Sequence, residues 1–320
     1  MAIASQVSRE TTGADVHTES GKSFERLKQQ LQDHSPSAAL LVAAHRGQWR
    51  EAPENSLAAI DEAINDGAEI VEVDVQLTKD GVPVLMHDAN LVRTTNGTGK
   101  LSSMTLSELK SLQLRETHGG AKAPITRHSI PTLEEAMNTA KNRAMVNLDN
   151  GWPIRDEILS VLESTGTVDH GIFKGSPTVR SAEEFMARDS NIQYMQVVSD
   201  ATAWKAFAFE GRQPVAVEVL FDSLTDPQAQ PEYLNRLGAQ GRVWINAISN
   251  SLSAGNTDDA SIRLDGERGW DNLVSKYGAN IIQTDNVEAI DYWRKGGSLR
   301  LWDKQNHAGG VHSEDENVLE

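Results

Sequence analysis

The chain has 320 residues, of which 38% are hydrophobic and 24% charged, and its formal net charge is −16. This composition is typical of a globular protein with a sizeable core, and the length fits one large α/β barrel or two small domains. The negative charge argues against nucleic acid and anionic membrane surfaces as partners. The absence of cysteine excludes disulfides, thiolate catalysis and cysteine-ligated zinc.

Both ends of the chain differ in composition from its middle. Residues 1–21 are rich in Ser, Thr and charge and contain no apolar segment of the kind found in signal peptides, so we expect a disordered lead-in. Residues 305–320 are polar and acidic, which is typical of a tail. No apolar stretch approaches the roughly 20 residues that a membrane span needs. We therefore expect one folded domain over residues 22–304 of a soluble protein, with the cytoplasm favoured as its location.

Short apolar runs alternate with amphipathic helical patterns along this domain. The runs that predict strands are Leu40–Ala44, Ile70–Gln76, Met145–Leu148, Gly171–Phe173, Tyr194–Val198, Val215–Val219, Arg242–Ile245 and Asn280–Gln283. The patterns that predict helices are Glu54–Asp66, Thr132–Lys141, Ile154–Glu163, Ser181–Ala187, Pro231–Leu237 and Gly269–Lys276. Eight strands separated by helices predict a parallel sheet closed as a (β/α)₈ TIM barrel, with a doubly wound sheet as the alternative.

One segment interrupts the alternation. After a short extra strand at Val82–Met86, the chain carries turn signals such as Asn96-Gly97 and Gly119-Gly120 and a single short helical pattern at Thr105–Leu112. We interpret residues 88–130 as an insertion after the second strand that folds over the barrel mouth. It either shapes access to a site there or is a decorated loop.

Polar residues stand at the ends of the apolar runs, where a barrel has its catalytic face. Glu72 and Asp74 are embedded in an Ile/Val run, and a buried carboxylate is costly unless it is paired or bound to a metal. Residues two apart on a strand point to the same side, so these two carboxylates can share a hard divalent cation. Together with His45-Arg46 and His87-Asp88, such a cation suits chemistry on a phosphate.

Later strands also end in polar residues, namely Asp149, Lys174, Glu218, Asn246 and Asp285. We expect Glu218 either in an ion pair inside the barrel or in contact with a ligand. Trp244 stands near a strand end, where it would either line the pocket or belong to the core.

Several ordered segments resemble the glycerophosphodiester phosphodiesterase family. They are Ala44–Gly47, Pro53–Ser56, Val71–Gly81, Pro83–Asp88, Arg93–Gly97 and Ile130–Glu135, and the likeness thins afterwards to Asn147–Asp149, Phe173–Gly175 and Ile282–Asp285. The resemblance implies a metal-dependent TIM-barrel hydrolase of phosphodiesters. Spider-venom sphingomyelinase D enzymes share the family's active-site plan.

The resemblance also implies roles for individual residues. Glu72, Asp74 and Asp149 would bind one Mg²⁺ or Ca²⁺ ion, because a set of oxygen ligands suits a hard cation. His45 and His87 would form the acid–base pair, in which one activates the nucleophile and the other protonates the leaving alkoxide.

Basic and amide groups complete the implied site. Arg46 would hold a phosphate oxygen or fix its loop, and Asn55 would cap the first helix or donate a hydrogen bond near the metal. Many family members carry a lysine shortly after the third acidic ligand, whereas Asp149 is followed by Asn150-Gly151. Lys174, after the next strand, could supply the missing charge.

Three functions follow for a small-molecule phosphodiester ligand. The first is hydrolysis of a glycerol- or sugar-containing phosphodiester to an alcohol and a phosphomonoester. The second is phosphoryl transfer to a hydroxyl group, which gives a cyclic phosphate or a new sugar diester. The third is a non-catalytic barrel that only binds phosphate, and the complete set of His45, Glu72, Asp74 and His87 argues against it.

Overall fold

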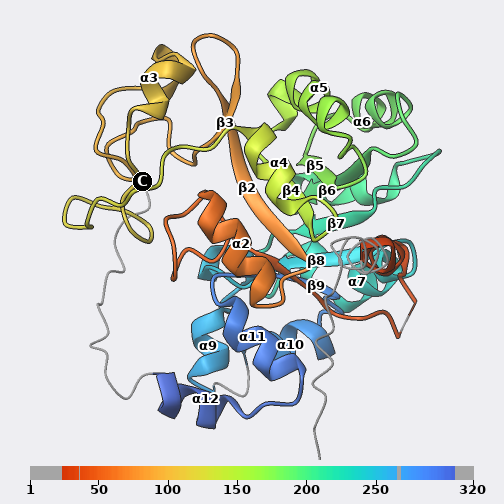
Figure 1. Ribbon diagram of the computed structural model, residues 1–320. Coiled ribbons are helices and arrows are strands. Elements are labelled where there is room, and N and C mark those ends of the chain that lie inside the picture. The colour runs from red at the N-terminus through yellow and green to blue at the C-terminus, as the bar shows by residue number, and fades with distance from the viewer. Residues whose placement is uncertain (1–23, 36, 265–267, 307–320) are drawn as a thin grey trace, which may run out of the picture.

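The computed structural model describes residues 24–35, 37–264 and 268–306, so the expected lead-in and most of the expected tail lie outside the described residues. Eight parallel strands close into a barrel, because β1 pairs with both β2 and β9 (Figure 1). The barrel strands are β1 (Leu41–Ala44), β2 (Ile70–Leu77), β4 (Met145–Asp149), β5 (Gly171–Gly175), β6 (Gln193–Val198), β7 (Ala216–Val219), β8 (Arg242–Asn246) and β9 (Ile281–Thr284). The predicted TIM barrel is confirmed, and each strand ends within two residues of its predicted bounds.

Helices surround the barrel on its outside (Figure 1). They are α2 (Leu57–Asn65), α4 (Leu133–Ala140), α5 (Arg155–Thr165), α6 (Val179–Met186), α7 (Pro231–Gly238), α8 (Asn250–Ser253), α9 (Asp258–Ile262), α10 (Trp270–Ser275), α11 (Val287–Arg294) and α12 (Leu299–Asn306). The connection after β6, for which the sequence predicts no helix, is a 3₁₀ helix, η3 (Asp200–Phe207). Among the described residues, every helix is too short or too polar to cross a lipid bilayer.

Two helices begin directly after a residue whose side chain accepts a hydrogen bond from a backbone amide of the first turn. Ser56 Oγ accepts a hydrogen bond from the Ala59 amide at 3.0 Å, so α2 begins after Ser56. Thr132 and Glu135 form a reciprocal capping box at the start of α4. Ser56 is therefore the cap of α2, and the side chain of Asn55 can make another contact.

The barrel interior changes from apolar to polar along the strands. Its lower layer, at the amino ends of the strands, consists of Leu41, Ala43, Ile70, Met145, Ile172, Met195, Ala216, Trp244 and Ile281. Phe24, Leu27 and Leu31 of the helix over residues 24–32 pack against this layer. Since side chains alternate along a strand, the inward positions two residues later carry Glu72, Asn147, Lys174, Glu218, Asn246 and Gln283.

The insertion stands beside β2 and has a small apolar core of its own. Strand β3 (Pro83–Leu85) pairs antiparallel with the end of β2, and the segment that follows contains a 3₁₀ turn and α3 (Leu106–Lys110) to one side of the barrel (Figure 1). Its buried residues are Val84, Met86, Leu91, Leu101, Leu109, Leu114 and Ile130. The Glu54 amide donates to the Thr117 carbonyl at 3.0 Å, which ties the insertion to the loop after β1.

Candidate active site

Three carboxylates meet at the carboxyl ends of β2 and β4. One oxygen each of Glu72, Asp74 and Asp149 lies within 4.8 Å of the other two, and the strand register sets Asp74 opposite Asp149. Burial, reinforced by the charge of Asp74, raises the pKa of Glu72 to about 8. Such a group of like charges needs a positive partner, and its oxygen-only donors fit a hard divalent cation such as Mg²⁺ or Ca²⁺.

A lysine from β5 lies next to this triad. Lys174 Nζ is 2.9 Å from Asp149 Oδ2 and 3.3 Å from Glu218 Oε2, and its side chain is only 8% exposed. Burial opposes the charged form, but the two carboxylates keep the pKa of Lys174 well above its ordinary value. The structure thus brings an ammonium group to Asp149, where the following residues supply no basic group. Glu218, expected either in an ion pair or at a ligand, contacts Lys174 and also lines the cavity described below.

The turn after β1 places a guanidinium beside the same carboxylates. The Arg46 amide donates to Glu72 Oε2 at 2.8 Å, and Arg46 Nε is 3.5 Å from Asp74 Oδ2. Arg46 has a left-handed backbone with a φ of 56°, an unusual conformation for a residue with a side chain. Its next neighbour has to be Gly47, because a Cβ there would lie 2.7 Å from the backbone of Ala59.

Two amide side chains hold Asp74 in place. Asn55 Nδ2 donates to Asp74 Oδ2 at 2.8 Å, and the Asp74 amide donates back to Asn55 Oδ1 at 3.0 Å. Asn150 Nδ2 donates to the other oxygen, Oδ1, at 3.1 Å. Of the two contacts expected for Asn55, the structure therefore contains the hydrogen bond near the proposed metal.

His45 is fixed by a carboxylate at the end of β9. Its Nδ1 lies 2.8 Å from Asp285 Oδ1, which also accepts a 2.7 Å hydrogen bond from Trp49 Nε1. No described residue makes a hydrogen bond to Nε2 of this ring. Burial alone would lower the pKa of His45, but the Asp285 carboxylate raises it to about 9.

His87 is held in a similar way on the loop after β3. Its Nδ1 lies 2.8 Å from Asp88 Oδ1, and Arg93 Nε donates to Asp88 Oδ2 at 2.8 Å. The Gln76 amide donates to the backbone carbonyls of Met86, His87 and Asp88 at 2.7, 3.0 and 2.9 Å, which ties this loop to the end of β2. His87 is the more exposed of the two histidines, with 43% of its side chain accessible.

Glu54, to which the sequence analysis gave no catalytic or binding role, connects the loop after β1 with the segment after β3. Glu54 is 3% exposed and accepts hydrogen bonds from Arg93 at 2.7 and 2.8 Å, from Arg46 at 3.2 Å, and from the His118 ring at 2.7 Å. Burial opposes its charge, yet these hydrogen bonds and the two guanidinium charges keep the pKa of Glu54 far below its ordinary value. Glu54 lies in the Pro53–Ser56 segment that resembles the family, and this resemblance could have indicated a role for it. The sequence does not show which residues contact it.

A cavity of about 480 Å³ opens at this end of the barrel. Its charged and amide lining comprises His45, Arg46, Asp149, Lys174, Glu218, Asn246, Gln283 and Asp285. His87 does not line it, and neither does Trp244, which is fully buried in the lower layer of the barrel. Of the two places expected for Trp244, the core is correct, because its position on β8 points it inward one layer below Asn246.

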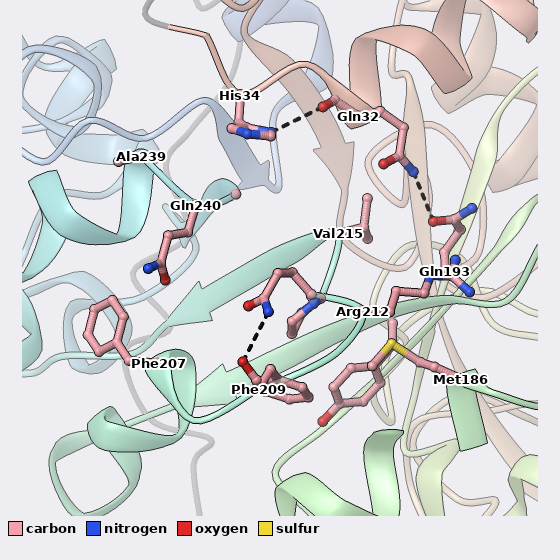
Figure 2. A pocket seen from close by; sticks show the side chains of 14 residues that line it. Gln32, His34, Met186, Gln193, Phe207, Phe209, Arg212, Val215, Ala239 and Gln240 are labelled. Carbon is pink, nitrogen blue, oxygen red and sulfur yellow. Dashed lines mark hydrogen bonds between the residues drawn. The ribbon is translucent and has the colours of Figure 1, made fainter. Parts of the chain in front are cut away.

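A second cavity, of about 550 Å³, lies at the amino ends of β6 and β7 (Figure 2). Its amide groups bond within the wall: Gln32 Nε2 donates to Gln193 Oε1 at 3.1 Å, and Gln213 Nε2 donates to the Phe209 carbonyl at 3.1 Å. None of the described residues that line it is a carboxylate. Since the strands are parallel, this cavity is at the end of the barrel away from the triad, and its described lining offers a hard cation no carboxylate ligand.

Asp285 determines the protonation of His45, and this can be measured. We expect Asp285→Asn to lower the pKa of His45 from about 9 toward its ordinary value of 6.5, because the main group that favours the imidazolium loses its charge. Titration of the His45 ring protons by NMR in metal-free protein checks this shift. An unchanged pKa in the variant would contradict the assigned contact, and Asp222→Asn, at an exposed position, is the matched control.

Comparison with known proteins agrees with this geometry. Residues 45–244 match the model of the glycerophosphoryl diester phosphodiesterase family. Glycerophosphodiester phosphodiesterase 1 from Homo sapiens is 42% identical over 112 residues, which is 35% of this chain and 34% of the human protein. The bovine protein of that name is 40% identical over 122 residues, 38% of this chain and 37% of its own length, so the chain spans little more than a third of these curated relatives.

Solved structures show the same fold. A glycerophosphoryl diester phosphodiesterase from Parabacteroides distasonis superposes with a TM-score of 0.64 at 24% identity, over 84% of this chain and 91% of that one. A phosphodiesterase from Oleispira antarctica, in complex with the product sn-glycerol-3-phosphate, gives a TM-score of 0.54 at 25% identity, over 78% of this chain and 94% of that one. With the family match covering the barrel from the His45 turn to β8, the chain belongs to the glycerophosphoryl diester phosphodiesterase family.

Proposed function

We propose that this protein is a metal-dependent phosphodiesterase that hydrolyses a glycerol-containing phosphodiester to an alcohol and a phosphomonoester. The observation that supports it most strongly is the acidic triad of Glu72, Asp74 and Asp149, with His45 at the mouth of the same barrel. The Oleispira antarctica relative, whose structure holds sn-glycerol-3-phosphate, supports the glycerol phosphate part of the proposal.

The residues of the triad would hold one Mg²⁺ or Ca²⁺ ion. When bound, the cation neutralises phosphate charge and polarises the phosphoryl group. Arg46 and Lys174 contribute two further positive charges at this place, which matter in a protein with a net charge of −16. A phosphodiester carries one negative charge, and the bound cation, Arg46 and Lys174 are the groups that would offset it among the carboxylates of the site.

The histidines would move the protons. With Nδ1 of His45 held by Asp285, its Nε2 is the nitrogen that can exchange a proton with the substrate. His87 has the corresponding arrangement with Asp88. One ring takes a proton from the attacking hydroxyl or water, and the other gives a proton to the leaving alkoxide, which is otherwise a poor leaving group near neutral pH.

Removal of divalent cations tests the proposal. We expect protein treated with EDTA to lose at least about a hundredfold in kcat on glycerophosphocholine, because the phosphate charge is no longer neutralised, and to regain activity with Mg²⁺ or Ca²⁺. Asp74→Asn should remain inactive at the same cation concentration, whereas Asp259→Asn, at an exposed position on α9, should behave as the unmodified protein.

The products of this reaction distinguish the alternatives. ³¹P NMR separates a phosphomonoester from a cyclic phosphate or a new diester, and either of the latter would assign phosphoryl transfer in place of hydrolysis. No turnover of any glycerophosphodiester with either cation would contradict the proposed function.

A further inference from the structure

The orientation of the His45 ring depends on Asp285. His45 Nδ1 lies 2.8 Å from Asp285 Oδ1, and no described residue makes a hydrogen bond to Nε2 of this ring. Because a carboxylate can only accept, the proton of the neutral ring lies on Nδ1, and Nε2 is left for the substrate. Movement of Asp285 would turn the ring or change the nitrogen that carries its proton. Groups that hold Asp285 therefore act on the reaction without touching the substrate.

The loop after β1 holds the side chain and the carbonyl group of Asp285. Trp49 Nε1 donates at 2.7 Å to Asp285 Oδ1, the same oxygen that contacts His45, and Arg50 Nε donates to the Asp285 carbonyl at 2.8 Å. The Trp49 indole is stacked on the His118 ring of the insertion, with 3.4 Å between the ring centroids. This stack fixes the plane of the indole, so its N–H keeps its direction toward Asp285.

A buried carboxylate on α9 holds the backbone of Asp285. Asp258 is 4% exposed, and its Oδ2 accepts a 2.7 Å hydrogen bond from the Asp285 amide. Its Oδ1 accepts hydrogen bonds from Trp270 Nε1 and Thr284 Oγ1, both at 2.8 Å. The Asp258 amide donates to the Ala247 carbonyl at 2.7 Å. Asp258 therefore joins the segments that follow β8 and β9 at the residue that contacts the histidine.

Asp258 is a carboxylate among uncharged donors. An indole N–H and a backbone amide can donate but not accept a hydrogen bond, so its contacts fit the ionised form. Burial and the nearby charge of Asp285 raise the pKa of Asp258 to about 7, which means that its charge is costly in the folded protein. A costly charge is weak evidence for a purely stabilising role, and its clearest effect is to fix the Asp285 amide.

Two separate segments thus hold the partner of the histidine, one by its side chain and one by its backbone. Resting on the proposed function, we propose that Trp49 and Asp258 are positioning residues of the reaction. They hold Asp285 so that His45 keeps its proton on Nδ1 and presents Nε2 to the substrate. The insertion, to which His118 belongs, then also supports the position of His45.

Kinetics on the metal-loaded protein test this inference. We expect Trp49→Phe and Asp258→Asn each to lower kcat on glycerophosphocholine by at least about tenfold, with KM changed by less than about twofold, because a misplaced proton-transfer group slows the reaction without weakening binding. Trp49→Phe keeps an aromatic ring against His118 and removes the N–H donor. The matched controls are Trp204→Phe, at a residue that is 62% exposed, and Asp259→Asn, at the exposed neighbour on α9, and both should leave kcat unchanged. Unchanged kcat in both test variants, or a change in KM alone, would overturn the inference.

A measurement without turnover separates this inference from the proposed activity. In metal-free protein, at a pH above the His45 pKa of about 9, ¹⁵N NMR of the imidazole nitrogens shows which of them carries the proton. We expect Nδ1 alone to carry it in the unmodified protein, and a mixture of both tautomers in Trp49→Phe and Asp258→Asn. A loss of stability alone does not produce such a mixture in the folded protein. A single Nδ1 tautomer in both variants would overturn the inference, whatever their kcat.

The two measurements can fail independently. If the unmodified protein cleaves no diester but the tautomers mix in the variants, the proposed hydrolysis fails and the positioning of His45 stands. If diesters are cleaved and both variants keep the single tautomer, the positioning role fails and hydrolysis stands. Trp49→Phe alters a half-buried side chain on a loop, so it decides the question if Asp258→Asn does not fold.

Discussion

We expect His45→Gln and His87→Gln each to lower kcat for phosphodiester cleavage by about a hundredfold to ten thousandfold, which corresponds to about 3–5 kcal/mol of lost transition-state stabilisation. The physical reason is the leaving alkoxide, which needs a proton, together with the nucleophile, which has to lose one. Glutamine has a similar length and can form hydrogen bonds but cannot accept or release a proton near neutral pH. Steady-state kinetics on the metal-loaded protein, with circular dichroism as a check on folding, measures the loss.

A double variant and a control variant test whether the loss of kcat comes from these two histidines acting together. The double variant should cost little more than the larger single one, because both rings act in the same reaction and their contributions are not additive. His34→Gln, at an exposed histidine near the cavity at the other end of the barrel, should leave kcat unchanged. Near-normal turnover in both single variants would contradict the acid–base pair, and a rise in KM with unchanged kcat would assign the rings to binding.

The barrel could be predicted because its strands are short, apolar and bounded by clear helix patterns. Val42, Val71 and Ile282 belong to runs that are buried whichever neighbours they have, so the pattern alone indicates them. The connection after β6 could not be predicted, because a 3₁₀ helix lacks the 3.6-residue periodicity that marks an α-helix. The apolar core of the insertion could not be predicted either, because its residues are scattered between turn signals and follow no helical or strand periodicity.

The candidate site could be predicted only where chemistry and strand position coincide. Glu72 and Asp74 are recognisable because carboxylates are rare in a buried strand, and the structure brings both to Asp149. Trp244 was ambiguous because a strand end does not say on which layer of the barrel an inward side chain lies. The pairings of His45 with Asp285 and of Arg93 with Glu54 join residues 240 and 39 positions apart, and no local pattern encodes such contacts.

Glu54 has the largest expected effect on stability. We expect Glu54→Gln to lower the free energy of unfolding at pH 7 by about 3–5 kcal/mol, because removing one partner of a buried ion pair leaves the other charge uncompensated. Here two arginines are affected, since Arg93 donates two hydrogen bonds to this carboxylate and Arg46 lies 3.2 Å from it. Urea unfolding measures the difference, and Glu134→Gln, at an exposed position on α4, should change stability by less than about 0.5 kcal/mol.

The pH dependence of this difference has a definite sign. The pKa of Glu54 is lower in the folded protein than its ordinary value of 4.5, so its contribution is complete above that pH and is lost as the pH falls toward the folded-state value. The gap in stability between the two proteins should therefore be constant from about pH 7 to pH 5 and should narrow below pH 4.5. Equal stabilities at pH 7, or a gap that does not narrow in acid, would contradict the ion-pair assignment.

The same variant connects stability with the reaction. Glu54 holds Arg93, which holds Asp88, and Asp88 contacts the His87 ring, so two residues connect the buried carboxylate to that histidine. We expect kcat of Glu54→Gln to fall under conditions in which the protein is fully folded, while KM changes less. The reason is that His87 loses its orientation, whereas Arg46, the cavity residue that contacts Glu54, keeps its contact with Asp74. A fall in stability with unchanged kcat would show that Glu54 joins the insertion to the barrel without positioning His87.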